Sequence, residues 1–141
     1  MIVAMLCVGF TSCSNDDDDV VTGEGIVGTW KITAVENHFY NGKIETDDLT
    51  PYEYYRKFNA DGTGAEYEYE YGYGWEIDEF RYTYNGNTLI VNSDGDITNM
   101  TVHSLTSSTM VVEYKDTDDD GVDYMIQTFK RVSDDKIKNA K

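Results

Sequence analysis

The sequence from Phe80 to Met100 reads FRYTYNGNTLIVNSDGDITNM and contains two β-hairpin signals in succession. Aromatic or aliphatic residues alternate with polar residues on either side of the first turn. Because this alternation has a period of two residues, one set of side chains lies on a buried face and the other set lies in water. The dipeptides Asn85-Gly86 and Asp94-Gly95 favour tight turns, because both central residues of such a turn need a positive φ. This stretch therefore predicts an antiparallel meander.

The same pattern continues toward both ends of the chain, where Asn41-Gly42, Asp61-Gly62 and Asp120-Gly121 are three further turn signals. A short helix or irregular turn is expected between Ile44 and Pro51. The segments between turns predict eight strands, over residues 28–36, 53–59, 63–71, 76–84, 88–92, 97–105, 109–115 and 123–132. Eight strands in up-and-down order can close on themselves, which removes exposed edges. The predicted fold is all-β, an eight-stranded antiparallel up-and-down barrel that is filled by side chains or holds one small ligand.

The acidic composition excludes several classes of partner. The net charge of the 141 residues is −16 and the pI is about 4.2. Nucleic acid is excluded as a partner, because its phosphates would be repelled. Docking on an anionic membrane through charge is excluded for the same reason. Nothing in the composition implies a cofactor.

The N-terminal residues resemble the end of a bacterial lipoprotein signal. An apolar run over residues 2–10 is followed by Thr11, Ser12 and Cys13, and then by an acidic run over residues 16–19. The resemblance implies cleavage before Cys13, acylation of Cys13 and attachment to a membrane through the acyl chains. No Lys or Arg precedes the apolar run, which departs from the pattern. The alternative is a short hydrophobic N-terminus with an incidental cysteine.

These features predict four parts of the chain: a signal peptide over residues 1–12, an acylated cysteine and acidic tether over 13–25, the barrel over 26–132 and a polar, frayed tail over 133–141. The acidic run after Cys13 resembles the surface-export signal of lipoproteins in Bacteroides-type bacteria. It implies an outer-membrane lipoprotein displayed on the cell surface, and periplasmic display stays open.

Three motifs resemble the lipocalin-like domains of bacterial surface lipoproteins. They are Gly28-Thr29-Trp30, the turn Phe58–Gly64 (FNADGTG) and the closing stretch Phe129–Val132 (FKRV). In lipocalins the tryptophan plugs one end of the barrel and a basic residue of the last strand lies across it. The resemblance places Trp30 and Arg131 in these positions, where a guanidinium over an indole contributes about 0.5 to 2 kcal/mol. It also implies a habit of binding small molecules, without naming a ligand.

The segment Glu66–Trp75 alternates glutamate with tyrosine. Tyr67, Tyr69 and Tyr71 share one face, and we expect this face to point into the barrel. One interpretation is a tyrosine-lined pocket that stacks on a ring and hydrogen-bonds its substituents. The other is a well-filled barrel in which the hydroxyl groups are satisfied.

Asp116, Asp118 and Asp120, followed by Gly121, match the first half of a calcium-loop pattern. The twelfth position is Gln127 rather than glutamate, and both flanks are expected strands rather than helices. An acidic hairpin turn is therefore the favoured interpretation, and these three aspartates are the weaker, metal-binding hypothesis.

The sequence offers no constellation for catalysis. It has no nucleophile-elbow or zinc-protease motif, and its two histidines, His38 and His103, have no partner at metal-ligand spacing. We therefore expect a binding module rather than an enzyme. The predicted function is a lipid-anchored extracytoplasmic module for a small hydrophobic, aromatic or glycan-like ligand. The alternative is an accessory lipoprotein with a filled barrel that docks on another envelope protein.

Overall fold

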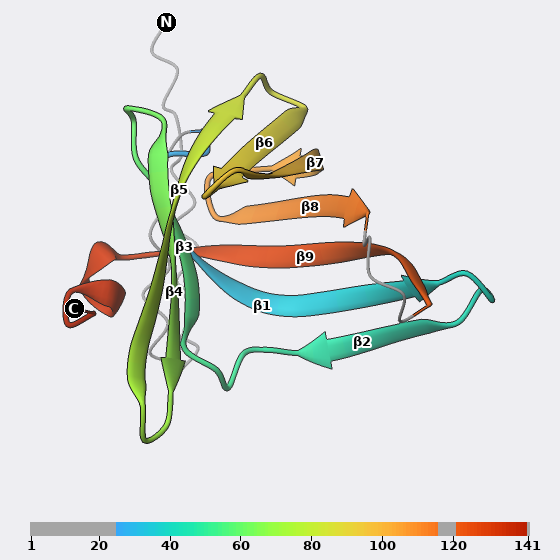
Figure 1. Ribbon diagram of the computed structural model, residues 1–141, viewed down its shortest axis with the longest axis horizontal. Helices are drawn as coiled ribbons and strands as arrows, with labels where there is room; N and C mark the ends of the chain where they lie inside the picture. The colour runs from blue at the N-terminus through green and yellow to red at the C-terminus, as the bar shows by residue number, and fades with distance from the viewer. Residues whose placement is uncertain (1–24, 116–120, 141) are drawn as a thin grey trace, which may run out of the picture.

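The structure, a computed structural model, describes residues 25–115 and 121–140 (Figure 1). Within these residues the chain forms nine strands and one short 3₁₀ helix, η1 (Asp134–Ile137). The strands are β1 (Gly28–Phe39), β2 (Ile44–Asp48), β3 (Tyr54–Phe58), β4 (Thr63–Glu70), β5 (Gly74–Tyr84), β6 (Thr88–Ser93), β7 (Asp96–Leu105), β8 (Thr109–Lys115) and β9 (Val122–Val132). No helix in this part of the chain has the length and apolar character needed to cross a membrane.

Closure of the sheet confirms the predicted barrel. From β3 onward each strand pairs antiparallel with the next, and β9 pairs back along β1 from Thr29↔Val132 to Phe39↔Val122. The closed ring contains β1 and β3 to β9, which are the eight strands of an up-and-down barrel.

Strand β2 corrects the expectation of a helix or irregular turn between Ile44 and Pro51. Strand β3 has only five residues and pairs with β1 only over Gly28–Lys31. The other half of the same β1 edge, Ala34–His38, would be left without partners, and β2 pairs with it instead. The ninth strand thus supplements the barrel wall.

The turns are less uniform than the dipeptides suggest. The β6–β7 turn has two residues, with φ of 50° at Asp94 and 99° at Gly95. Asp94 is the one described non-glycine residue with positive φ. The other described turns are longer, so the glycine of each dipeptide alone takes a positive φ.

A bulge at Thr33 keeps apolar side chains on the inner face of β1. Ile32 pairs with Phe129 and Ala34 pairs with Thr128, so β1 carries one extra residue at this point. The alternation shifts there, and Trp30, Ile32 and Val35 all pack in the same core. The main core contains Trp30, Ile32, Phe58, Phe80, Leu89, Val91, Met100, Val102, Met110, Val112 and Phe129.

A second apolar cluster lies on the outer face of the barrel wall. Tyr55, Val132 and Ile137 form it, and Tyr67 and Trp75 pack against it. Ile137 belongs to η1 and is only 7% exposed. The first residues after β9 are therefore packed on the barrel, which corrects the expectation of a frayed tail from residue 133.

Candidate ligand-binding chambers

Seven strands contribute to a hollow of about 300 Å³ in the barrel interior, here called the inner chamber. Its walls combine aromatic and aliphatic side chains with polar and charged ones. The lining residues are Tyr54, Arg56, Glu66, Asp78, Phe80, Val91, Ser93, Thr98, Met100, Tyr114 and Gln127.

Arg56 is the charged group at the centre of the inner chamber's hydrogen bonds. It is only 4% exposed, and its Nη2 forms an ion pair with Glu66 Oε1. Its Nη1 donates to Gln127 Oε1 at 3.4 Å, which is a long hydrogen bond. Its Nε has no hydrogen-bond partner among the described residues. The guanidinium therefore has unused donor capacity, which is costly in a buried position.

Glu66 also accepts a hydrogen bond from Tyr54, whose Oη lies 3.0 Å from Glu66 Oε2. Burial, followed by the negative charge of Glu66, raises the pKa of Tyr54 far above its ordinary value. Tyr54 therefore stays protonated at physiological pH and acts as a donor. The two donors hold the Glu66 carboxylate in one orientation.

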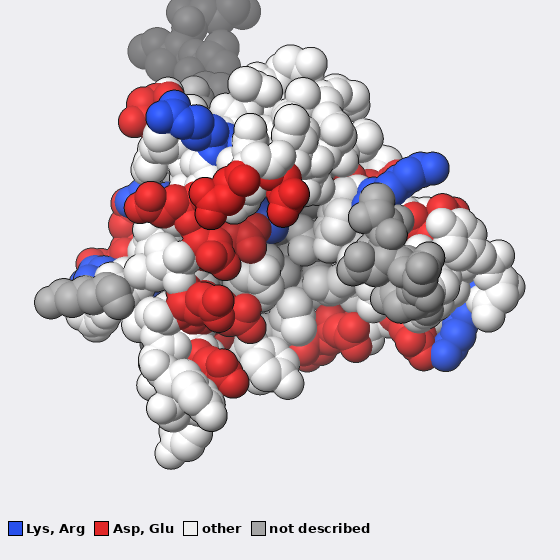
Figure 2. All heavy atoms as spheres, in the orientation of Figure 1, with Lys and Arg blue, Asp and Glu red and all other residues white. Residues whose placement is uncertain are grey.

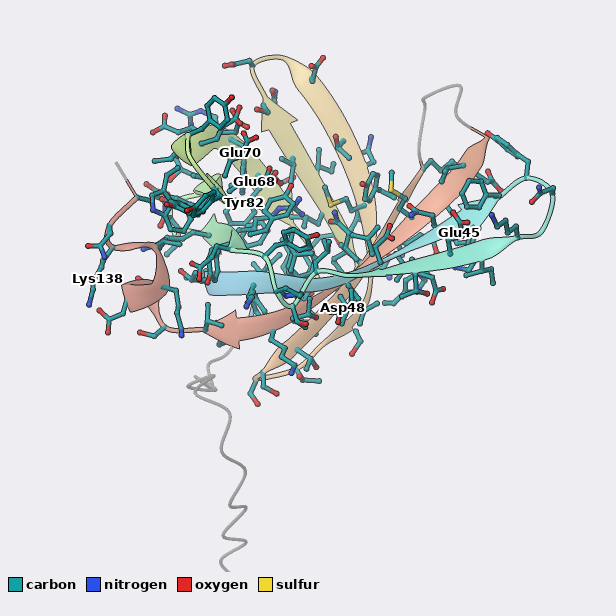
Figure 3. The ribbon with its side chains drawn as sticks, turned by 90° about the horizontal axis from the view of Figure 1, so that it is seen from below. Glu45, Asp48, Glu68, Glu70, Tyr82 and Lys138 are labelled. Atoms are coloured by element: carbon teal, nitrogen blue, oxygen red, sulfur yellow. The ribbon has the colours of Figure 1, made fainter. Side chains whose placement is uncertain are left out.

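A second hollow of about 470 Å³, here called the side chamber, opens where β2 replaces β3 along β1. It is lined by Val35, Asn37, Asp47, Asp48, Leu49, Tyr52, Tyr54 and Glu68. Tyr54 lines both chambers. Asp48, at the end of β2, and Glu68, on β4, come from different parts of the wall (Figure 3).

The side chamber is strongly acidic. It contains three carboxylates, and no Lys or Arg is among its described lining residues. Asp48 accepts hydrogen bonds from the Thr50 hydroxyl at 2.7 Å and the Thr50 amide at 2.9 Å, and these hold the pKa of Asp48 below its ordinary value. Asp47 accepts from Asn37 Nδ2 at 3.2 Å. Figure 2 shows Asp and Glu side chains gathered over the middle of this view, with Lys and Arg mostly near its margins.

The expected orientation of the β4 tyrosines is wrong. Tyr67 packs in the outer cluster with Tyr55 and Trp75, Tyr69 is 43% exposed and Tyr71 is 94% exposed. The glutamates of β4 face inward instead, because Arg56 opposite Glu66 in the β3–β4 register supplies a buried partner. The three tyrosines therefore do not line either chamber.

The opposite end of the barrel is closed by Trp30 and Arg131. The Arg131 guanidinium carbon lies 4.1 Å from the centre of the Trp30 ring, and Trp30 is fully buried. The three guanidinium nitrogens donate to backbone carbonyls: Nε to Ser107 at 2.9 Å, Nη1 to Val27 at 2.6 Å and Nη2 to Gly25 at 2.5 Å. Gly28 makes room for this contact, since a Cβ on it would lie 2.4 Å from Arg131 Nη1.

The remaining predicted sites fall outside these two regions. Cys13 and the three aspartates Asp116, Asp118 and Asp120 lie outside the described residues. Among the residues that are described, no cluster of His, Cys, Asp or Glu could hold a metal ion. Of the three predicted tyrosines, Tyr67 lines a further hollow of about 530 Å³, together with Arg81 and Asp94, where β5 leaves β6.

Sequence reasoning missed Arg56, although the signal was available. Tyr54, Arg56 and Phe58 alternate with Tyr55 and Lys57 along β3, and Phe58 is an obvious core residue. An arginine in phase with a core phenylalanine predicts a buried guanidinium, which needs a nearby acid such as Glu66.

Comparison with known proteins agrees with this architecture. The family model described as a lipocalin-like domain matches residues 26–112, more than half of the chain. The chain is similar to the crystal structure of a lipocalin-like protein from Bacteroides uniformis, with 12% identity and a TM-score of 0.53 over 74% of this chain and 96% of that one. It is also similar to a protein from Bacteroides eggerthii, with 14% identity and a TM-score of 0.53 over 74% of this chain and 98% of that one. No curated protein matches the sequence significantly.

Proposed function

This chain belongs to the family of lipocalin-like domains, and we propose that it is a binding module that takes up a small molecule in the interior of its barrel. The observation that supports this function best is the inner chamber, a hollow of about 300 Å³ that retains charged and polar side chains inside an otherwise apolar core. Pockets that bind small molecules combine apolar walls with a few converging polar groups in this way.

The polar groups of the chamber argue against an interior that is merely filled. A barrel selected only for stability would favour apolar residues at the position of Arg56, because replacing a buried ion pair by apolar residues is often neutral or stabilising. Here the Nε donor has no described partner and the bond to Gln127 is long. A ligand oxygen in the chamber could engage such donor capacity after a small side-chain movement.

The walls of the inner chamber favour a compact ligand with a ring. Tyr54, Phe80 and Tyr114 supply aromatic surface, while Glu66, Ser93 and Thr98 supply hydrogen-bonding groups. A long acyl chain would leave these polar groups without partners, which is costly. An aromatic or glycan-like compound with hydroxyl substituents fits this mixture better.

Filling the inner chamber tests the function. Val91 lines it from β6, whereas its neighbour Ile90 does not, so Val91→Phe is matched by Ile90→Phe as a control. The test panel comprises tyrosol, methyl glucoside and octanol, titrated calorimetrically. We expect at least one compound to bind the wild type and Ile90→Phe, and to bind Val91→Phe at least tenfold more weakly. Circular dichroism and melting curves show whether both variants fold.

Two results would contradict the proposal. One is equal binding to wild type and folded Val91→Phe. The other is the absence of binding by the whole panel, together with no co-purifying small molecule in native mass spectra of the protein from its own cells.

We also propose that the barrel is tethered to the outer membrane through acyl chains on Cys13 and displayed outward. The support is the lipoprotein-like sequence around this residue and the acidic run that follows it. Metabolic labelling with a palmitate analogue tests the tether. We expect label in the wild type and none in Cys13→Ala, and label in both variants would refute acylation at this position.

A further inference from the structure

The wall of the barrel is interrupted beside β5, and we propose that this free edge binds an extended protein segment as an added antiparallel strand. Strand β5 pairs with β4 from Gly74 to Arg81, but it pairs with β6 only from Arg81 to Tyr84. Figure 1 shows β5 continuing well past the β6–β7 hairpin, so residues 74–80 have a neighbour on one side only among the described strands. This interaction goes beyond the proposed function, because it needs no ligand in the inner chamber.

The backbone along this edge has unused hydrogen-bonding groups. The Tyr82 amide donates to the Gly62 carbonyl at 2.8 Å, so Tyr82 and every second residue before it bond toward β4. Trp75, Ile77 and Glu79 alternate with these residues, and their N–H and C=O groups point away from β4. Apart from the Glu79 carbonyl, which accepts from a β6 serine hydroxyl at 3.3 Å, these groups have no hydrogen-bond partner in the described part of the chain. They form a template for a further strand.

Two hollows flank the end of the free edge that lies nearest β6. The hollow of about 530 Å³, here called the outer hollow, joins β5 to the β6–β7 turn and is lined by Glu79 and Asp94. On the inner face, Asp78 and Ser93 line the inner chamber from the same two sides. Side chains of an added strand alternate between the two faces, so each set has a hollow beside it. This fit is independent of the free backbone groups.

The side chains of β5 determine the chemistry of the partner. Glu76 and Asp78 are exposed on the inner face, and neither forms an ion pair with a described cation. On the outer face lie Trp75 and Ile77, and Ile77 is 36% exposed. Opposed residues of an antiparallel pair share a face, and opposite charges stabilise such pairs. The fitting partner is therefore a segment in which Lys or Arg alternates with apolar residues.

The same charges argue against a second copy of this chain as the occupant. Two copies of β5 paired around Ile77 would place Glu76 of one copy opposite Asp78 of the other, and like charges in this position are destabilising. The acidic run over residues 16–19 has the wrong charge for the same reason. The occupant is therefore a basic segment of another protein.

Three end-blocked heptapeptides test the inference by calorimetry on the full-length chain at low salt. KVKVKVK has the required alternation, KKKKVVV has the same composition and charge without it, and EVEVEVE has the reversed charge. We expect KVKVKVK to bind roughly tenfold more tightly than KKKKVVV, because the alternation lets several backbone hydrogen bonds form together with both sets of side-chain contacts. EVEVEVE should not bind measurably.

Methylation of the peptide backbone separates strand addition from attraction by charge. In the antiparallel arrangement the three valines lie opposite Trp75, Ile77 and Glu79, so their amides donate to β5, whereas the lysine amides point away. N-methylation of the three valines removes these donors, and N-methylation of three lysines leaves them in place. The valine-methylated peptide should bind roughly tenfold more weakly than the lysine-methylated one, although their charges are equal.

A matched pair of variants assigns the effect to β5. Ile77→Pro removes an N–H that points to the free edge, and proline is tolerated there because β4 does not use this group. Ile77→Thr retains the N–H. Ile77→Pro should weaken binding of KVKVKVK roughly tenfold, and Ile77→Thr less than about threefold. Circular dichroism shows whether both variants fold, and the methylated peptides decide alone if Ile77→Pro does not.

The outcomes separate this inference from the proposed function. Equal affinity for KVKVKVK and KKKKVVV, equal affinity for the two methylated peptides, or weaker binding of the lysine-methylated one overturns the strand addition. Failure of KVKVKVK to bind also overturns it. None of these results bears on the uptake of a small molecule, which Val91→Phe and the compound panel decide.

Discussion

The two buried arginines of this barrel have similar surroundings and different uses. Arg131 and Arg56 are each 4% exposed, and each lies over an aromatic ring, that of Trp30 or Phe129. Arg131 makes three hydrogen bonds of 2.5 to 2.9 Å to backbone carbonyls. Arg56 pairs with one carboxylate, donates from Nη1 to the Gln127 amide oxygen at 3.4 Å and to Met100 Sδ at 3.9 Å, and leaves Nε without a described partner.

Under the proposed binding function, burial alone does not separate a structural arginine from one that contacts a ligand. The two arginines differ in how completely their guanidinium N–H groups are used in hydrogen bonds. Arg131 holds together the chain before β1 and the loop before β8, so its role is fulfilled within the protein. Arg56 lines the inner chamber and keeps unused hydrogen-bond donor capacity, which a ligand in that chamber could use.

Removal of Arg131 should have the largest effect on stability. Arg131→Ala leaves three backbone carbonyls without their donor and removes the cover of Trp30. We expect a loss of about 2–4 kcal/mol in the free energy of unfolding, measured by urea denaturation, because breaking several buried charged hydrogen bonds costs this much.

The neighbouring Lys130→Ala is the control for Arg131→Ala. Lys130 is exposed on the same strand, so its removal should change the free energy of unfolding by less than about 0.5 kcal/mol. Similar stability of Arg131→Ala and the wild type would show that the closed end contributes little.

The sequence predicted the barrel and its closed end well. Turn glycines and alternation determine an antiparallel meander almost by themselves, and the family resemblance located Trp30 and Arg131. Strand β2 was missed because its sequence, IETDD, has no buried residue, and it forms only because β3 is too short to cover β1.

The chambers were predicted less well, for a physical reason. In the segment Glu66–Tyr71 the glutamates and tyrosines alternate perfectly, so either set could face inward. Hydrophobicity favours inward tyrosines, but an outer apolar cluster built by Val132 and Ile137 accepts Tyr67. The buried Arg56 then stabilises Glu66 inside. Val132 and Ile137 lie far from Glu66 in sequence, and Arg56 acts from the neighbouring strand, so the pattern along Glu66–Tyr71 alone does not show either determinant.

Replacement of Arg56 should have an intermediate effect. Arg56→Met removes the cation that pairs with Glu66, but the Glu66 side chain is 27% exposed and can be hydrated. We expect a loss of about 1–2 kcal/mol in the free energy of unfolding, which is less than the full cost of breaking a buried pair. The double variant Arg56→Met/Glu66→Leu should recover most of this loss, as urea denaturation of the wild type, the single variant and the double variant would show.

This recovery distinguishes a pair kept for binding from one kept for stability. If the double variant is less stable than the single one, the ion pair is itself a structural element, and Arg56 resembles Arg131 more than its geometry suggests.

The smallest effect is expected at Asp134, which pairs with Lys57, a half-buried cation that follows Arg56 in β3 and faces outward. Its Nζ lies 2.8 Å from Asp134 Oδ2, and the Thr29 hydroxyl donates to Asp134 Oδ1 at 2.5 Å. These two hydrogen bonds, that of Lys57 first, lower the pKa of Asp134. A carboxylate with a lowered pKa stabilises the fold above its unfolded pKa of about 4 and loses that contribution as the pH falls through its folded pKa.

Asp134→Asn should therefore cost about 0.5 kcal/mol at pH 7, since the Asp134 side chain is 64% exposed and its ion pair is screened by water. The difference from the wild type should shrink below pH 4, where the native carboxyl group takes up its proton. Asp135→Asn, one residue further along η1, is the matched control and should show no such dependence, because Asp135 makes only a 3.5 Å contact with Lys138 among the described ion pairs. A constant difference between Asp134→Asn and the wild type from pH 7 to pH 3 would mean that the hydrogen bond from Thr29, rather than the charge facing Lys57, holds η1 against the barrel.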